Sequence, residues 1–263
     1  MTNLLMVEGL GVEIAGKPVV NNVSFNVAQG EVFGLVGESG AGKSLTGRSI
    51  IRLLPPTARA VGKILFKGTD LLTIDENRMR NVRGREITMI QQDPVASLNP
   101  AFRIRDQIVD IIKMHLKANG SEAESRAIQL LREVGIASPE NVLRKYPHQL
   151  SGGMCQRVMT AIAFACEPSL VIADEPTTAL DVITQAMVVN LMKRMKNQFN
   201  TAIIFITHNL ALAVNVCDRI AVMNKGTVVE TLQASEFFHE AKHEYTRKLL
   251  ASTPSIHSVR GIG

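Results

Sequence analysis

The sequence predicts an α/β fold: antiparallel strands at the start, a core of mostly parallel strands covered by helices, and a helical insert within that core. Three observations predict it. A glycine-rich segment, residues 37–44, lies between an apolar strand-like run and a helix-like run. Strand-like and helical runs alternate after residue 167, which is typical of parallel sheets. The segment from 94 to 166 instead has helical periodicity throughout.

Length and composition bound the class of protein. The 263 residues suit one large domain or two small ones, and 46% of them are hydrophobic. No apolar run approaches the roughly 20 residues that a membrane span needs. The first residues, Met1-Thr2-Asn3, lack the basic start of a signal peptide. We therefore expect a protein of the cytosol, or one held at a membrane by a partner.

Cysteine usage and charge exclude two further classes. Cys155, Cys166 and Cys217 show no C-x-x-C spacing, so we expect them to be reduced and to pack as small hydrophobic residues. The net charge of +5 is mild and its basic residues are scattered, with no Trp and two Tyr. A nucleic-acid reader would cluster its basic residues, so we expect no nucleic-acid partner.

The residues before 93 are expected to form short strands and two helices. Val23, Phe25 and Val27 alternate with polar residues, as in a half-buried antiparallel strand. The run after the glycine-rich segment predicts a helix from Ser44 to Leu54, ended by two prolines. The other expected elements are strands at Leu4–Val7, Val12–Ile14, Val19–Val27, Val32–Val36, Val61–Lys67 and Glu86–Ile90, and a helix at Asp75–Val82.

The helical insert is expected to contain three main helices. The first presents one apolar face, formed by Ile104, Ile108, Ile111, Ile112 and Leu116. The second begins with a capping box of Ser121 and Glu124 and ends at Gly135. It buries Ala123, Ala127, Leu130, Leu131 and Val134. Ser151 caps the third, after a connector from Pro147.

Strand and helix alternate again after the insert. The expected strands are Leu170–Ala173, Ala202–Ile206 and Arg219–Met223, and the expected helices are Asp181–Lys196 and Leu210–Val216. This gives core segments at 1–93 and 167–250 around an insert at 94–166. The polar end, 251–263, is expected to be a loose tail.

The glycine-rich segment fits the phosphate-binding pattern G-x-x-x-x-G-K-[ST]. Small residues let the backbone wrap an anion, and the helix that follows directs its N-terminal amides at it. In this pattern Lys43 reaches the β- and γ-phosphates and the hydroxyl of Ser44 binds Mg²⁺. The alternative is a glycine-rich turn with an exposed lysine, which the strand–loop–helix context disfavours. The candidate residues are Gly37, Glu38, Ser39, Gly40, Ala41, Gly42, Lys43 and Ser44.

Two carboxylates follow the apolar strand at Leu170–Ala173. Ligands of open parallel sheets bind at the carboxyl ends of strands, so Asp174 and Glu175 are expected beside the phosphate loop. One carboxylate can hold Mg²⁺ and the other can activate an attacking water. The alternative, a pair of solvated acids at a strand exit, is the better interpretation only without the phosphate loop.

Three further polar positions are candidates of weaker signal. Ser151-Gly152-Gly153 opens a helix, with Gln156 one turn on, and is either an anion-binding turn or an ordinary cap. His208 follows the strand at Ala202–Ile206, where it faces the ligand edge or is simply a loop histidine. Gln92 stands between the core strand and the insert, where its amide can contact Mg²⁺ or water.

Together and in this order, the motifs resemble those of the ATP-binding subunit of an ABC transporter, from Leu4 to about Leu250. The resemblance implies that Gly37–Ser44 is the Walker A loop and that Gln92 is the glutamine of the Q-loop. Ser151–Gln156 is then the signature motif, Asp174 the Walker B aspartate and Glu175 the catalytic glutamate. Asp181 becomes the D-loop aspartate and His208 the switch histidine.

The family also implies a fold, ligands and partners. The implied fold is a P-loop NTPase (RecA-like) core with an N-terminal antiparallel β subdomain and an inserted α-helical subdomain. ATP and Mg²⁺ are the implied ligands. Gln92–Pro100 and Ala173–Val182 resemble the branch that imports dipeptides, oligopeptides or nickel. That branch implies a second ATPase, identical or not, two permeases, a solute-binding protein and a place at the cytoplasmic face of the membrane.

The chain departs from the family at two points. Position 14, where relatives place an aromatic residue against adenine, is Ile14. Many peptide-type members continue into a cysteine-rich C-terminal extension that this sequence does not show. That difference favours the shorter nickel or metal-chelate members.

Two other functions remain as alternatives. His239-Glu240-Ala241-Lys242-His243 fits the zinc-protease pattern H-E-x-x-H. A protease needs both histidines on one helix and a third ligand, and the segment is expected to be a loop between a helix ending near Phe238 and one starting near Tyr245. The second alternative is an ABC ATPase without a transporter, although such proteins generally carry two cassettes.

Overall fold

The computed structural model describes residues 3–178 and 181–252. By their contacts, these residues form two compact units. Unit 1 comprises the described residues up to Ile74 and those from Ala202 onward, and unit 2 runs from Asp75 to Thr201. Unit 2 contains the predicted helical insert, 94–166, together with elements on both sides of it. Most of the predicted C-terminal tail, residues 253–263, lies outside the described residues.

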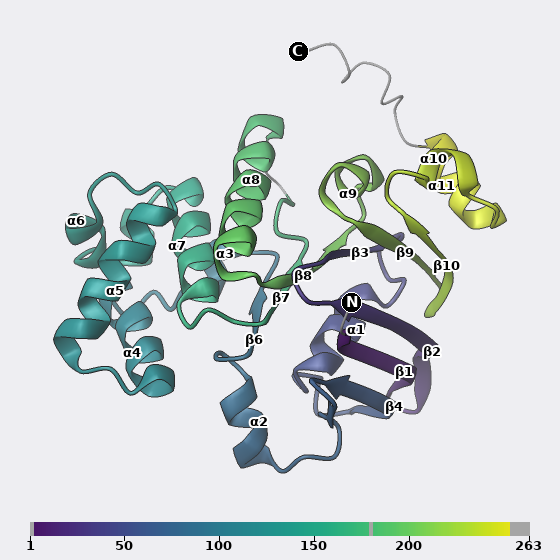
Figure 1. Cartoon of the computed structure of the whole chain (residues 1–263), viewed down its shortest axis with the longest axis horizontal. Coiled ribbons are helices and arrows are strands. Elements are labelled where there is room, and N and C mark those ends of the chain that lie inside the picture. The colour runs from purple at the N-terminus through teal and green to yellow at the C-terminus, as the bar shows by residue number, and fades with distance from the viewer. Residues whose placement is uncertain (1–2, 179–180, 253–263) are drawn as a thin grey trace. The chain divides into compact units, whose positions relative to one another are not determined.

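The N-terminal strands of unit 1 form the predicted antiparallel sheet, in the order β2-β1-β4-β5 (Figure 1). The strands are β1 (Asn3–Ile14), β2 (Lys17–Ala28), β4 (Ala58–Phe66) and β5 (Thr69–Asp70). The prediction of two separate strands within β1 was wrong. The chain continues through an irregularity between Val7 and Leu10, where Gly9 has φ +58°.

A second sheet in unit 1 carries the predicted parallel pairing. β3 (Val32–Val36) lies between β8 (Ala202–Thr207) and β9 (Arg219–Asn224) and is parallel to both. All five residues of β3 are buried, as its continuous apolar run predicts. β10 (Thr227–Gln233), which the sequence did not predict, pairs antiparallel with β9. Helix α9 (Leu210–Val216) has the predicted bounds and contacts β3 and β8.

Helix α1 (Lys43–Ile50) is shorter than the predicted helix, which extended to Leu54. Its end is set by backbone hydrogen bonds and not by the prolines. Arg52 takes a left-handed φ of 53°. The amides of Arg52 and Leu53 donate to the carbonyls of Ser49 and Arg48. These two bonds satisfy carbonyls of the last turn and close the helix.

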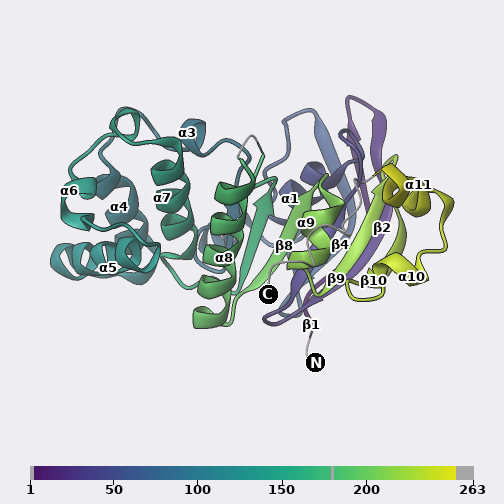
Figure 2. The ribbon, with the colours of Figure 1, turned by 90° about the horizontal axis from the view of Figure 1, so that it is seen from above.

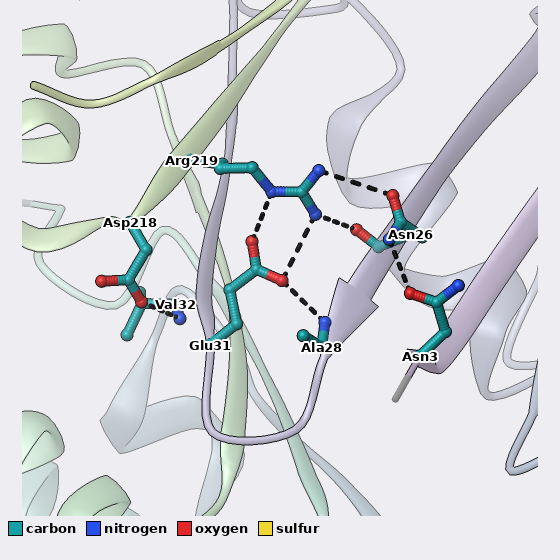
Figure 3. Close-up of polar contacts among 7 residues, drawn as sticks. All are labelled: Asn3, Asn26, Ala28, Glu31, Val32, Asp218 and Arg219. Carbon is teal, nitrogen blue, oxygen red and sulfur yellow. Dashed lines mark hydrogen bonds and ion pairs between the residues drawn. The ribbon is translucent and has the colours of Figure 1, made fainter. Parts of the chain in front are cut away.

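An ion pair fixes the entry of β3 to its neighbours (Figure 3). Arg219 Nε donates to Glu31 Oε1 over 2.6 Å, and the second carboxylate oxygen accepts from the amide of Ala28 at 2.6 Å. Arg219 Nη2 also donates to the carbonyl of Asn26 at 2.7 Å. The next residue, Asp218, accepts from the amide of Val32 at 2.8 Å. The start of the strand that leads into the phosphate loop is therefore anchored from β2 and β9.

The last described helices of unit 1 are α10 (Phe237–Glu240) and α11 (Glu244–Ser252), next to β10 in both ribbon views (Figures 1 and 2). Ala241 is extended and ends α10. The two histidines of H-E-x-x-H therefore do not share a helix. In the described part of the chain, no three His, Cys, Asp or Glu side chains gather as a metal site. Both findings contradict the zinc-protease alternative.

Unit 2 contains two parallel strands, β6 (Ile87–Ile90) and β7 (Leu170–Asp174), as predicted. Helix α2 (Glu76–Val82) precedes them, and α8 (Val182–Phe199) follows. Between the strands lie the helices of the predicted insert. These are α3 (Pro94–Ser97), α4 (Ile104–Leu116), α5 (Gly120–Glu133), α6 (Pro139–Leu143), a 3₁₀ turn at Pro147–Gln149, and α7 (Gly152–Phe164).

Two details of the insert were predicted wrongly. Leu116 is 42% exposed at the C-terminal end of α4, whose buried residues, Ile104, Ile108, Val109 and Ile112, all precede it. The capping box of α5 is formed by Asn119 and Glu122, two residues earlier than predicted. Glu124 instead pairs with Arg105 at 2.7 Å. The predicted buried residues of α5 are confirmed. They are Ala123, Ala127, Leu130 and Leu131, with Val134 at its end.

None of the helices among the described residues is both long and apolar enough to cross a lipid bilayer.

Candidate functional site

The glycine-rich segment of unit 1 forms a tight loop between β3 and α1. A Cβ at Gly37 would collide with the carbonyl oxygen of Met223. Gly42, the N-cap of α1, has φ +99°, and a Cβ there would lie 2.9 Å from the terminal methyl carbon of Met223. Both positions therefore require glycine. Glu38, Ser39 and Gly40 form the exposed rim of the loop, and Ala41 is buried beneath it.

Lys43 lies inside this loop and is only 4% exposed. Its ammonium donates to the carbonyls of Gly37 at 2.8 Å and Glu38 at 2.9 Å. The positive charge is thus held where the loop curves. Ser44 follows in the first turn of α1 and is half-buried. This strand–loop–helix geometry is what the phosphate-binding pattern predicts, and the alternative of an exposed lysine on a turn is wrong.

The β9–β10 hairpin contacts the phosphate loop and the start of α1. The sequence did not predict these contacts. The amide of Gly226, in the hairpin turn, donates to the carbonyl of Ala41 at 3.1 Å. The sulfur of Met223 lies 3.9 Å from the hydroxyl of Thr46 in α1. Met223 is completely buried. No motif points to these residues, because they act through the backbone and through packing.

His208 lies at the same strand edge as the phosphate loop. β3 and β8 are parallel neighbours, and Val36 pairs with Thr207. The loop and His208 therefore leave adjacent strands in the same direction. His208 is exposed. Thr207 accepts from the amide of Asn209 at 3.0 Å, and Asn209 caps α9, so the backbone on both sides of the histidine is fixed.

Unit 2 brings Glu175 and Gln92 together. β6 and β7 are parallel, with Ile90 paired to Ala173, so both polar residues follow neighbouring strand ends. Asp174 ends β7 and is 4% exposed. Glu175 takes a left-handed φ of 49°. Its Oε2 accepts from the hydroxyl of Thr178 at 2.8 Å and from the amide of Gln92 at 3.4 Å.

The turn before α7 has its three small residues exposed. Ser151 caps the helix by accepting from the amide of Met154 at 3.3 Å, as predicted. Gly152 and Gly153, the first two residues of this 13-residue helix, are also exposed. Gln156 is buried and donates to the carbonyl of Pro176 at 3.1 Å. Its predicted contact with nucleotide stays a prediction, while its observed contact ties α7 to the segment after Glu175.

Asp181 caps α8, which begins at Val182, one residue after the predicted start. It accepts from the amide of Thr184 at 2.9 Å and from its hydroxyl at 2.7 Å. The residue is exposed. Asp181, Gln92, Asp174, Glu175 and the turn at Ser151 all belong to unit 2, whereas the phosphate loop and His208 belong to unit 1.

The three cysteines are free and buried, as expected. Burial raises the pKa of Cys166 to about 11 and also raises the pKa of Cys155. A raised pKa keeps a thiol protonated near neutral pH, and the protonated form is a poor nucleophile.

A family model described as ABC transporter matches residues 20–178, which include the phosphate loop, Gln92, the turn at Ser151 and both strand-end acids. The chain belongs to the ABC transporter family. It is an ATPase of that family, as its motifs predict. The predicted fold class is also confirmed.

Relatives of known name agree with the predicted branch. The chain is 46% identical to the oligopeptide transport ATP-binding protein OppD of Bacillus subtilis, covering 98% of this chain and 74% of that protein. It is 47% identical to the dipeptide transport ATP-binding protein DppD of Escherichia coli, covering 94% and 76%. It is 50% identical to the peptidoglycan transport ATP-binding protein YejF of Agrobacterium fabrum, where it covers 91% of this chain but 44% of that protein.

Solved ABC cassettes share the fold. The cbiO1 protein of Clostridium perfringens, part of the cbiONQ ABC transporter complex, aligns over all of both chains with a TM-score of 0.78 and 28% identity. A dimeric ATP-binding cassette in a post-hydrolysis state, bound to ADP and phosphate, aligns with a TM-score of 0.76 and 25% identity. That alignment covers 88% of this chain and 98% of the cassette.

Proposed function

We propose that this ATPase powers the import of peptides, as the ATP-binding subunit of a membrane complex. The observation that carries the proposal is the phosphate loop, in which Lys43 is buried among backbone carbonyls at the N-terminus of α1. A buried ammonium beside helix amides is a site for a polyphosphate, because charge and dipole act together on the same anion. ATP is such an anion.

In this proposal Lys43 moves from the carbonyls of Gly37 and Glu38 to the β- and γ-phosphates. The loop amides of the residues from Ser39 to Ser44 bind the remaining phosphate oxygens. The hydroxyl of Ser44, the amide oxygen of Gln92 and the carboxylate of Asp174 are the residues that would hold Mg²⁺. These are hard oxygen donors, the type that Mg²⁺ prefers, and the ion would neutralise phosphate charge.

Glu175 is proposed as the general base for the attacking water. The hydroxyl of Thr178 and the amide of Gln92 both donate to the same carboxylate oxygen, Oε2. Two donors on one oxygen orient the carboxylate, which in this proposal accepts a proton from the attacking water. His208, at the edge shared with the phosphate loop, is proposed to contact the γ-phosphate.

The exposed turn of Ser151, Gly152 and Gly153 is proposed to bind the ATP held by a second ATPase subunit, with Asp181 at the same subunit boundary. The dimeric cassette bound to ADP and phosphate supports this arrangement. We further propose two permease subunits as partners, with a solute-binding protein acting through them. The chain would then lie at the cytoplasmic face of the membrane, held by its partners.

Peptides are the proposed cargo because two of the relatives described above, at 46% and 47% identity, are named for oligopeptide and dipeptide transport. Nickel and metal chelates, which the sequence alone favoured mildly, have no comparable support.

Transport by a reconstituted complex tests the proposal. The chain is co-purified with its membrane partners, placed in vesicles, and supplied with ATP and Mg²⁺ on the side of the ATPase. We expect uptake of radiolabelled di- to pentapeptides in the presence of the solute-binding protein, and none of nickel. Uptake of nickel, but not of peptides, would contradict the proposal that peptides are the cargo. ATP hydrolysis without any permease partner would instead favour the non-transport alternative.

A further inference from the structure

A contact within unit 1 joins the phosphate loop to the C-terminal helix α11. The backbone amide of Glu38 donates to the hydroxyl oxygen of Tyr245 at 3.2 Å, although 207 positions separate the two residues. No part of the phosphate-binding pattern predicts a partner for this amide. Tyr245 is half-buried, with its hydroxyl directed at the exposed rim of the loop.

With this contact, both backbone polar groups of Glu38 are hydrogen-bonded. The carbonyl of Glu38 accepts from Lys43 Nζ at 2.9 Å, and its amide donates to Tyr245. Lys43 must leave this carbonyl when it moves to phosphate. The bond to Tyr245 lies on the other side of the residue and does not depend on Lys43. It can therefore hold the start of the loop while the lysine changes partner.

The position of Tyr245 is itself fixed by a sheet strand. Glu230 in β10 accepts from the amide of Lys242 at 2.7 Å and from that of His243 at 3.3 Å. The amide of Tyr245 donates to His243 Nδ1 at 3.2 Å, and Thr246 is completely buried. These bonds attach the first turn of α11 to β10. The hydroxyl is thus presented by the folded sheet.

We propose that Tyr245 is a positioning residue for the phosphate loop, which pre-orders the backbone at Glu38 and so raises the affinity for ATP. The inference rests on the proposed role of residues 37–44 in binding phosphate. Because the hydroxyl bonds to the loop backbone and not to nucleotide, it acts on binding. The chemical step, which depends on Glu175, is left unchanged.

The test replaces Tyr245 by phenylalanine in the full chain, which removes only the hydroxyl. Lys248→Ala is the control, because Lys248 lies on the same helix and its pair with Glu244 is exposed on both sides, at 72% and 81%. We expect Tyr245→Phe to weaken ATP binding roughly two- to tenfold, the size of one neutral hydrogen bond. Turnover at saturating ATP should stay within about twofold of wild type, because the chemical step is untouched. Lys248→Ala should change neither quantity.

Hydrogen exchange at the Glu38 amide, followed by NMR, tests the contact directly and without activity. We expect this amide to be protected in the wild type and to exchange faster in Tyr245→Phe, with the amides of β3 unchanged. Fast exchange in the wild type would overturn the inference. So would unchanged ATP affinity in a Tyr245→Phe chain beside a wild type that binds normally. A wild type that binds no ATP would overturn the proposed function as well.

Discussion

The hydroxyl of Thr178 donates to Glu175 Oε2 at 2.8 Å, so the carboxylate that directly follows β7 is oriented by a residue three positions later. Glu175 itself has a left-handed φ of 49°, which non-glycine residues seldom adopt. The following turn therefore holds both the backbone and the side chain of the proposed base. Strain of this kind persists where the surrounding structure enforces it.

Replacement of Glu175 by glutamine should abolish most turnover while ATP still binds. The amide cannot accept a proton from water, and loss of a general base typically lowers the rate by about 10²- to 10⁴-fold. The measurement is steady-state hydrolysis together with ATP titration. Glu140→Gln is the matched control, because Glu140 lies in an exposed ion pair with Arg132. Undiminished hydrolysis in Glu175→Gln would show that this acid is not the base.

Replacement of Lys43 by alanine should weaken ATP binding at least tenfold and stop turnover. The change removes a charge-assisted contact to phosphate, and each such bond contributes about 1.5–3 kcal/mol. The far-UV circular dichroism spectrum should match that of wild type, because the lysine contacts the loop and not the core. Lys63→Ala, at an exposed position of β4, is the control. ATP affinity equal to wild type in folded Lys43→Ala would refute the assignment of the loop.

Replacement of Ile14 by tyrosine should tighten ATP binding and leave turnover at saturating ATP nearly unchanged. Ile14 ends β1 and is half-buried opposite Lys17 and Ala58, so it offers an apolar edge but no aromatic face. Stacking of a base on an aromatic ring is worth roughly 1–3 kcal/mol in nucleic-acid sites, a loose guide here.

Titrations of ATP and GTP against both proteins, in the same salt, give the measurement. Wild type should discriminate poorly between the two nucleotides. Glu13→Tyr is the control, because neighbouring residues of a strand face opposite sides of the sheet. If Ile14→Tyr binds no better than wild type, position 14 does not face the base.

Replacement of Arg219 by methionine should destabilise the chain by about 3 kcal/mol, the lower end of the loss found when one partner of a buried ion pair is removed, because this pair is partly buried. The Glu31 side chain is only 10% exposed and Arg219 25%, so the remaining carboxylate cannot be fully solvated. Urea unfolding measures the loss. Arg132→Met breaks the exposed pair with Glu140 and should cost less than about 1 kcal/mol. Equal losses in both variants would refute the structural role of Arg219.

Acid should release the C-terminal helix from β10. Burial alone would raise the pKa of Glu230. The Thr246 hydroxyl and the amides of Lys242 and His243 together lower this pKa by more than burial raises it, so the net shift is downward. A carboxylate with a lowered folded-state pKa stabilises the fold above the ordinary glutamate pKa, about 4.3, and this contribution disappears as the pH falls through the lowered value.

The protection of the Lys242 and His243 amides, measured as their hydrogen-exchange rate relative to the intrinsic rate, should therefore decrease selectively below about pH 4.3. In Glu230→Gln the same amides should lose this dependence on pH, beyond the intrinsic change in exchange rate. The exposed Glu236→Gln serves as control. Protection that is independent of pH in the wild type would contradict a role for the Glu230 carboxylate.

The sequence by itself predicted most helices and strands of this protein and its phosphate-binding loop. β3 and α9 have their predicted bounds because the signals for both are local. A continuous apolar run predicts β3, and apolar residues at helical spacing predict α9. The loop at Gly37–Ser44 could be recognised because wrapping a phosphate requires particular residues at fixed spacing. The cap of α5 was predicted at the wrong residue. Asn119 caps this helix instead of Ser121, because neighbouring polar residues compete to accept from the same amides.

Only the tertiary structure decided what surrounds those motifs. Tyr245 reaches the amide of Glu38 across 207 positions, and Gly226 reaches the carbonyl of Ala41 from a hairpin whose second strand the sequence did not predict. Gln156, expected at the nucleotide, is buried against Pro176. Each of these contacts has a backbone group on at least one side, and every residue carries such groups, so the partners are selected by tertiary packing and leave no pattern in the sequence.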